Sequence, residues 1–475
     1  MELAKNYSGD PHEHDGDSAI IYGDGELRKI YDAKANSDPG CTRGVTMPER
    51  KLEWQTVAMI EIGEVIGGGI LTMGCAFAQL GWVLATFFLV LFLIVNVYIG
   101  LVVSRVSEIF PTALSFKEMA QLTGLHKAAV KLISLSVQTY MIFCMSGYLL
   151  AASEALSMVF FDVELCGPLW GTITLGLVAF PIQVRSLHGA RWLVWANFAF
   201  VVIAVFASCI YMIRNIDIHH ASTLTSTATA IFPEDLTWIS FFNGISKLLF
   251  AYLGCYLYLQ MLAEMRKPSD FPKTFLIAGP FQVGMYMFVG TVGYIYDGVS
   301  AKSIILDSIN PHTHGATLRA AAIFLALHLI VTYVILSTVL VRRIHVYADD
   351  ASVNDRGKRG RVVWLALSLS LLLLCFILAN AIPLFDKITS LAGALQAPII
   401  GFIAPCLFLL FAHRRAGIRT SKLEMFVLFT VILCSTIILF VGTAANIISF
   451  IDAMNEQKKT PFECVMASYI DNWSS

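Results

Sequence analysis

Two ionisable side chains lie deep inside long apolar stretches of this sequence. Glu64 is ten residues beyond Trp54, where the first apolar stretch begins, which places it about 15 Å along a helix. Lys247 is nine residues beyond Trp238 in a later stretch. A charge at the centre of a bilayer costs at least about 2.5–3.5 kcal/mol, so such residues usually mark an ion or substrate pathway. Both are therefore candidates for ion coupling.

Glycines interrupt both stretches near these charges. Gly67, Gly68 and Gly69 directly follow Glu64, and each costs about 1 kcal/mol in a helix interior relative to alanine. The run favours a helix that unwinds in the membrane and offers its backbone to a ligand. Close packing of helices on small residues is the alternative. Gly254 marks a similar break in the later stretch.

The composition is too apolar for a soluble protein. Apolar residues make up 57% of the 475 residues and charged residues 14%, whereas soluble domains have about 45–50% and about 25%. The net charge of −1 excludes a strongly basic nucleic-acid binder. The ten cysteines form no CxxC pair, and the sequence has no cluster of His residues and carboxylates. We therefore expect no metal site, no cofactor site and no enzymatic activity.

Apolar stretches of about 20 residues are long enough to cross a bilayer. We expect an all-α membrane protein with eleven transmembrane helices, at residues 54–79, 82–106, 128–156, 168–184, 191–213, 238–261, 273–296, 318–341, 362–382, 387–411 and 423–450. Pro398 and Pro405 interrupt the tenth span, so two shorter helices are the alternative there.

The placement of basic residues gives the orientation of these helices. With the N-terminus in the cytosol, 26 of the 33 Lys and Arg residues fall on the cytosolic side, six fall outside, and Lys247 lies within a span. We therefore expect residues 1–53 to be a disordered cytosolic tail and residues 451–475 to be an extracytosolic tail. Asn472 begins an N-x-S sequon in that outer tail, although an unused chance match is the favoured interpretation.

Helices one and six are five spans apart. Because a repeat of five spans crosses the membrane an odd number of times, the second repeat would have the opposite orientation in the membrane. We expect repeat one at about residues 54–213, repeat two at about 238–411, and an extra eleventh helix at about 423–450. Broken first helices of inverted repeats are typical of transporters: their half-helix N-termini bind a carboxylate and their freed carbonyls bind a cation. A substrate with both groups is an amino acid.

Several motifs resemble the amino acid/auxin permease family, in its fungal neutral amino-acid permease branch. They are EVIGGGIL at residues 64–71, FAYLG at 250–254, EMRKPSDFPK at 264–273 and NAIP at 380–383. The resemblance implies a five-plus-five inverted repeat and amino acid uptake driven by a cation gradient, usually of protons. Cys255 and Lys247 depart from the family pattern, which has His and a neutral residue there, so the resemblance leaves the substrate and the ion open.

We expect alternating access, with the substrate at the two breaks. The residues expected to contact it are Gly67, Gly68, Gly69, Phe250, Tyr252, Gly254, Cys255 and Tyr140. His328 and Thr332 are further candidates, and ordinary packing is the favoured interpretation for these two and for Tyr140. Glu64 is the expected protonation site, and Lys247 either pairs with it or lines a wet cavity.

The expected function is proton-coupled transport of neutral amino acids, with sodium as the less favoured ion. The expected location is the plasma membrane, with the vacuolar membrane as the alternative. Two other functions stay open: transport of an amino-acid-like secondary metabolite, and sensing by a non-transporting nutrient receptor.

Overall fold

The computed structural model describes residues 50–65, 67–185, 191–222, 229–233, 235–349, 352–353, 357–382 and 384–457. All of them belong to one compact unit, which spans residues 49–475. Residues 1–49 of the expected cytosolic tail lie outside this range, as do residues 458–475 with Asn472.

The described residues are helical and form no strand beyond one isolated bridge. The helices are α2 (Trp54–Val65), α3 (Gly67–Leu71), α4 (Met73–Ile109), α5 (Phe116–Leu122), α6 (Lys127–Val159), α7 (Gly167–Ala179), α8 (Arg191–Ser222), α9 (Trp238–Tyr252), α10 (Tyr258–Glu264), α11 (Thr274–Asp297), α12 (Pro311–Asp349), α13 (Lys358–Ala381), α14 (Phe385–Leu395), α15 (Ala404–Ala416), α16 (Lys422–Ile437) and α17 (Thr443–Gln457). Short 3-10 turns include η2 (Cys255–Leu257) and η3 (Pro268–Lys273), and π-helical segments are η7 (Ala397–Ile403) and η8 (Ile438–Gly442).

Nine stretches of the described residues are long and apolar enough to cross a membrane. The predicted spans at residues 54–79 and 168–184 are not among them: the first is divided into α2, α3 and the start of α4, and the second contains α7 of only 13 residues. The count of eleven therefore stays a prediction. Gly81 has a φ of 71° and divides α4 at the predicted boundary between the first two spans.

The tenth predicted span is one continuous helical stretch with a change of pitch. α14 leads into the π-helical segment η7, which contains Pro398, and α15 follows with Pro405 near its start. A proline removes a backbone donor from the helix, and a π-helical turn accommodates the missing bond. The predicted interruption is thus a local widening of the helix.

Apolar side chains cover much of the outer surface as well as the core. Leu423, Phe426 and Leu433 of α16 are all exposed, and only 17% of the most apolar window of the last span is buried. Large exposed apolar surfaces on a helical protein indicate contact with lipid.

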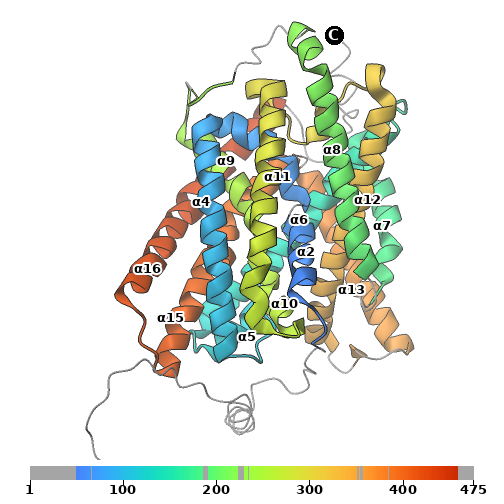
Figure 1. Ribbon diagram of the computed structural model, residues 1–475. Helices are drawn as coiled ribbons and strands as arrows, with labels where there is room; N and C mark the ends of the chain where they lie inside the picture. Colours follow the sequence, from blue (N-terminus) through green and yellow to red (C-terminus); the bar gives the residue numbers. More distant parts are fainter. Residues whose placement is uncertain are drawn as a thin grey trace, which may run out of the picture. The chain divides into compact units, whose positions relative to one another are not determined.

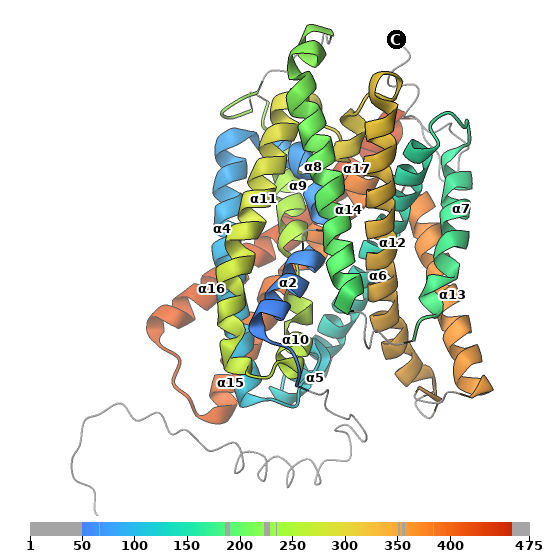
Figure 2. The same cartoon turned by 45° about the vertical axis from the view of Figure 1, so that its right-hand side comes forward.

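The helices lie side by side in a bundle, and each of the two broken helices has one half in the lower part of it and one in the upper part (Figures 1 and 2). In Figures 1 and 2, α2 and α10 lie in the lower half and α9 lies in the upper half. α4 packs against both α9 and α11, and α14 packs against α6 and α9. The breaks of the first and sixth spans therefore lie in the interior, where helices from both predicted repeats surround them.

Candidate functional site

The first span is interrupted directly after the glycine triplet. α2 ends at Val65, α3 contains the three glycines, and α4 begins at Met73. Between α3 and α4, Thr72 has φ −96° and ψ 4°, and its hydroxyl donates a hydrogen bond to the Gly69 carbonyl at 3.1 Å. Ile66, between α2 and α3, lies outside the described residues. The structure therefore shows an interruption of the helix at Thr72, at the end of the glycine-containing segment.

The sixth span is broken after Tyr252. Leu253 has φ −81° and ψ 81°, which ends α9, and the chain resumes through η2 into α10. Two carbonyls next to the break accept hydrogen bonds from tyrosines: Ala251 from the Tyr286 hydroxyl at 2.7 Å, and Leu253 from the Tyr140 hydroxyl at 3.3 Å. A carbonyl oxygen has two lone pairs, so each retains capacity for a ligand.

A small cavity lies between the two breaks and has room for about one water molecule in this conformation. Its lining residues are apolar, aromatic or glycine, and none carries a formal charge: Gly68, Gly69, Tyr140, Tyr148, Phe250, Leu253 and Tyr256. The Tyr140 ring contacts the Tyr256 ring edge-on, with the ring centroids 5.3 Å apart. Once widened, such a lining suits a small ligand with an apolar part and a few polar groups.

The structure brings only some of the predicted substrate-binding residues to this cavity. Gly68, Gly69, Phe250 and Tyr140 line it, whereas Gly67, Tyr252, Gly254 and Cys255 do not. The Cys255 thiol instead donates to the Ile400 carbonyl at 3.3 Å.

His328 and Thr332 lie behind the cavity and do not line it. His328 Nδ1 is 3.1 Å from the Asn197 carbonyl, and Asn197 also donates to the Thr332 hydroxyl at 3.0 Å. A side chain at Gly67 would meet His328 Nε2 at 3.4 Å. These residues therefore support the glycine segment from α12.

The glycine triplet also permits close contact between helices. A Cβ atom at Gly69 would lie 2.6 Å from the Ala251 Cα atom, and one at Gly68 would lie 2.7 Å from a ring carbon of Tyr148. The Gly69 neighbour is backbone, so it has no flexible side chain that could move away. Close packing, the alternative interpretation of the triplet, is thus present together with the breaks.

Replacing Gly69 by alanine is expected to abolish substrate transport, because the added methyl group must push α3 away from α9 at the cavity wall. Gly63→Ala is the matched control in the same span, since a Cβ atom there meets only Phe198 Cβ, at 3.8 Å. Uptake by purified, reconstituted protein measures both. Equal uptake by the two variants would show that the close contact at Gly69 is not needed for transport.

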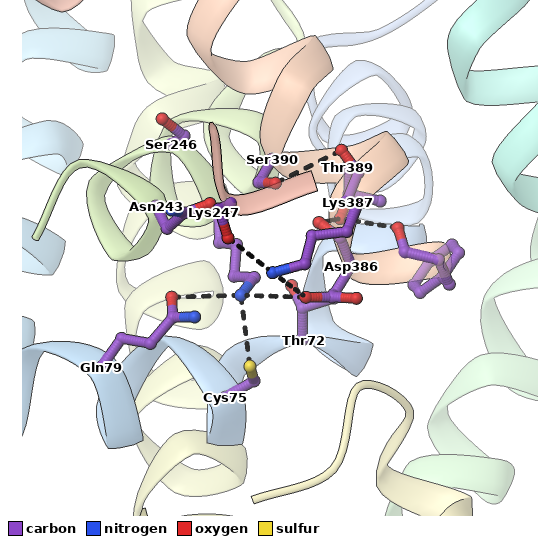
Figure 3. A network of polar contacts seen from close by, with 12 residues as sticks. Thr72, Cys75, Gln79, Asn243, Ser246, Lys247, Asp386, Lys387, Thr389 and Ser390 are labelled. Carbon is purple, nitrogen blue, oxygen red and sulfur yellow. Dashed lines mark hydrogen bonds and ion pairs between the residues drawn. The ribbon is translucent and has the colours of Figure 1, made fainter. Parts of the chain in front are cut away.

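Lys247 is the centre of a buried polar network in the upper half of the bundle. Its ammonium group donates to Gln79 Oε1 at 3.1 Å and to Cys75 Sγ at 3.2 Å, both on α4, and lies 3.5 Å from Asp386 Oδ2 on α14. Figure 3 shows the lysine pointing from α9 into the space between these two helices. Lys387 Nζ lies 3.6 Å from the same Asp386 oxygen. The side chain of Glu64, the partner expected from the sequence, lies outside the described residues.

Glu61 is a second buried acid, in the lower half of the bundle. It is 1% exposed, and its Oε1 atom accepts a hydrogen bond from the Tyr258 hydroxyl at 2.9 Å. Its Oε2 atom has no hydrogen-bond partner in the described part of the chain. The two buried sites therefore differ: the Lys247 site contains paired charges, and the Glu61 site contains a single acid with one neutral donor.

Sequence reasoning did not propose several residues that the structure places at these sites. Tyr148 and Tyr256 were not proposed because an aromatic residue in an apolar helix usually belongs to the core. Asp386 was not proposed because the tenth span was predicted to begin one residue later, at Lys387. The charged side chains next to the predicted start of an apolar helix were the available signal.

Known proteins resemble the chain over most of its length. It is 24% identical to the N amino acid transport system protein of Neurospora crassa over 93% of this chain and 94% of that protein. It is 23% identical to the amino acid transporter AVT1D of Arabidopsis thaliana, over 72% of this chain and 60% of that one.

A solved structure, that of MhsT in complex with L-phenylalanine, shares the fold. It covers 85% of this chain and 99% of its own chain with a TM-score of 0.57, at 15% sequence identity. An inverted repeat whose first and sixth helices are broken is in keeping with this fold, and both breaks are present here.

The family profile for transmembrane amino acid transporter proteins matches residues 50–448. That match includes both broken helices, the cavity between them and all four motifs noted in the sequence. The chain therefore belongs to the transmembrane amino acid transporter family, an integral membrane protein family.

Proposed function

We propose that this protein is a proton-coupled secondary active transporter that moves neutral amino acids by alternating access. The observation that carries the proposal is the cavity between two broken helices, whose lining has no formally charged side chain. Backbone N–H groups of α3 bind the substrate carboxylate, and the carbonyls of Ala251 and Leu253 accept hydrogen bonds from its ammonium group.

The cavity lining supports selectivity for a neutral side chain. Phe250, Leu253 and the tyrosine rings provide apolar contact for the substrate side chain. A substrate with an additional charge would leave that charge buried without a partner, which is strongly unfavourable. Discrimination against basic and acidic amino acids follows from this missing partner.

Proton coupling is proposed because carboxylates lie within the first span. Glu64 is the residue that the sequence favoured. Glu61 lies one turn earlier on the same helix, and Lys247 is an ionisable group of the sixth span. A buried carboxyl group is stable as the neutral acid and becomes charged when water reaches it. We propose the plasma membrane as its location, and the distribution of basic residues supports an N-terminus in the cytosol.

Uptake into proteoliposomes tests the function directly. Purified protein should accumulate labelled alanine or phenylalanine when the exterior is acidic, and a protonophore should abolish accumulation. Sodium should not replace the proton gradient, and excess lysine or glutamate should compete poorly. Empty liposomes are the control for leakage. Binding of amino acids without any flux would favour the nutrient receptor, and flux of other amine-containing acids alone would favour the secondary metabolite transporter.

A further inference from the structure

We propose that Glu61 binds the transported proton, and that it retains the proton while its hydrogen bond with Tyr258 joins the half-helices α2 and α10. This inference rests on the proposed proton coupling and names the residue responsible for it. It also differs from the expectation drawn from the sequence, which favoured Glu64.

The first support is the incomplete solvation of the Glu61 carboxyl group. Glu61 is 1% exposed, so water does not reach it in this conformation. The Tyr258 hydroxyl is its one donor, at 2.9 Å from Oε1, and the buried Oε2 atom has no partner in the described part of the chain. An ionised carboxylate usually accepts several hydrogen bonds or pairs with a cation. The neutral acid is therefore the form that this environment favours.

No cation compensates a negative charge at this position in the part of the chain that the structure describes. The nearby titratable groups are neutral in their usual forms, namely the Tyr258 hydroxyl and, beyond it, the Cys255 thiol. In η3, Lys273 is already paired with Asp270 at 2.7 Å. α11 has no charged residue before Asp297 at its end, and α8 has none between Trp192 and Ile213. Of the charged residues on neighbouring segments, the side chains of Glu64 and Arg191 lie outside the described residues.

The second support is the position of Glu61 between two half-helices that must separate if the lower side is to open. Tyr258 is the first residue of α10, and Asn96 of α4 donates to its hydroxyl at 3.4 Å. The rings of Phe271 and Phe275 contact the Tyr258 ring edge-on, with ring centroids 5.3 and 5.8 Å away. Glu61 is thus buried where Tyr258 of α10 meets α2, and aromatic rings surround Tyr258.

Residues 51–52, just before α2, join the end of α10 directly. The N–H groups of Lys51 and Leu52 donate to the Glu264 carbonyl at 2.9 and 3.0 Å, and the Arg266 N–H donates to the Leu52 carbonyl at 2.8 Å. These backbone bonds fasten the two half-helices together at the lower end of the bundle. When they break and the helices separate, water enters the seam, solvates the carboxylate and favours release of the proton.

This arrangement links the protonation of Glu61 to conformation. The proton binds to a carboxyl oxygen, which cancels the charge and permits the buried contact between Glu61 and Tyr258. Opening exposes Glu61, the O–H bond breaks, and the proton passes to water on that side. A ligand shifts a conformational equilibrium only through its different affinity for the two states, and the buried, unpaired acid provides this difference for the proton.

Glu61→Gln tests the assignment because it mimics the neutral acid in size and shape. In proteoliposomes this variant should lose accumulation driven by a pH gradient, yet retain exchange of labelled for unlabelled amino acid, and that exchange should not depend on pH. Glu108→Gln, the same substitution at an exposed carboxylate near the end of α4, is the matched control and should retain pH-driven accumulation. Retention of wild-type accumulation and pH dependence by Glu61→Gln would overturn the assignment, as would their loss in Glu64→Gln alone.

Tyr258→Phe provides a second test that does not depend on the folding of the first variant. The tyrosine hydroxyl stabilises the carboxylate, so its removal should increase proton affinity and shift half-maximal uptake to higher pH. Tyr294→Phe is the control: this tyrosine lies near the C-terminal end of α11, away from Glu61, and its replacement should leave the pH profile unchanged. An unshifted profile in Tyr258→Phe contradicts the assignment. A wild-type protein that accumulates amino acids without any response to a pH gradient would instead overturn the proposed proton coupling itself.

Discussion

Replacing Asp386 by asparagine is expected to destabilise the folded protein more than replacing Lys247 by methionine. Both ammonium groups, of Lys247 and Lys387, approach the same Asp386 oxygen, at 3.5 and 3.6 Å. Asp386→Asn leaves two cations close together without an anion, whereas Lys247→Met leaves Asp386 with one cation. Removing one member of a buried ion pair typically costs about 3–5 kcal/mol, and we expect Asp386→Asn to lie at the upper end of that range.

Thermal unfolding of the detergent-solubilised protein measures this difference as a lower Tm. Lys387→Met is the matched control, because it removes a lysine from the same carboxylate but leaves the fully buried Lys247 in place. The double variant Lys247→Met, Asp386→Asn should be more stable than Asp386→Asn alone, since it removes an uncompensated cation. Equal Tm values for Asp386→Asn and Lys247→Met would contradict this prediction. A double variant whose loss of stability equals the sum of the two single losses would contradict it as well.

The sequence alone identified the charged residue of this network but not its partner. Lys247 was conspicuous because charges are rare within apolar helices. Asp386 lies at the start of α14, where a helix pattern does not reveal whether a side chain faces water or protein. The pairing depends on how α9 and α14 are rotated relative to one another, and that rotation is decided by tertiary packing. Local periodicity therefore gives the helix but not the contact.

The cavity shows the same division between local and tertiary information. The glycine triplet and the break near Gly254 were predictable, because unusual residues interrupt otherwise regular helices. Tyr148 and Tyr256 have the same apolar surroundings in the sequence as core aromatics, and only the fold shows that they line a cavity. Likewise, Glu61 and Glu64 are three residues apart on the same helix face, and the sequence could not show that Glu61 contacts Tyr258 of α10.

Gly393→Ala is expected to destabilise the folded protein more than Gly69→Ala does. A Cβ atom at Gly393 would overlap the Ser246 carbonyl oxygen and lie 2.8 Å from the Ser246 carbonyl carbon. Both atoms belong to the backbone of α9, so the helices themselves must separate. Overpacking in a core commonly costs about 1–3 kcal/mol and occasionally more, and we expect a greater loss at Gly393 because no side chain can move away.

Separation of α9 and α14 would also weaken the ion pair between Lys247 and Asp386. Gly393 is seven residues, or about two helical turns, beyond Asp386 on α14, so the two share a face, and Ser246 precedes Lys247 on α9. The glycine thus allows the close approach that brings lysine and aspartate within 3.5 Å. If so, Asp386→Asn should cost less in the Gly393→Ala background than in the wild type, because residues that share a contact are not additive. Gly284→Ala, whose Cβ atom would meet nothing within 4 Å, should leave the Tm unchanged or raise it. Additive losses in the cycle would show that the glycine and the ion pair act independently.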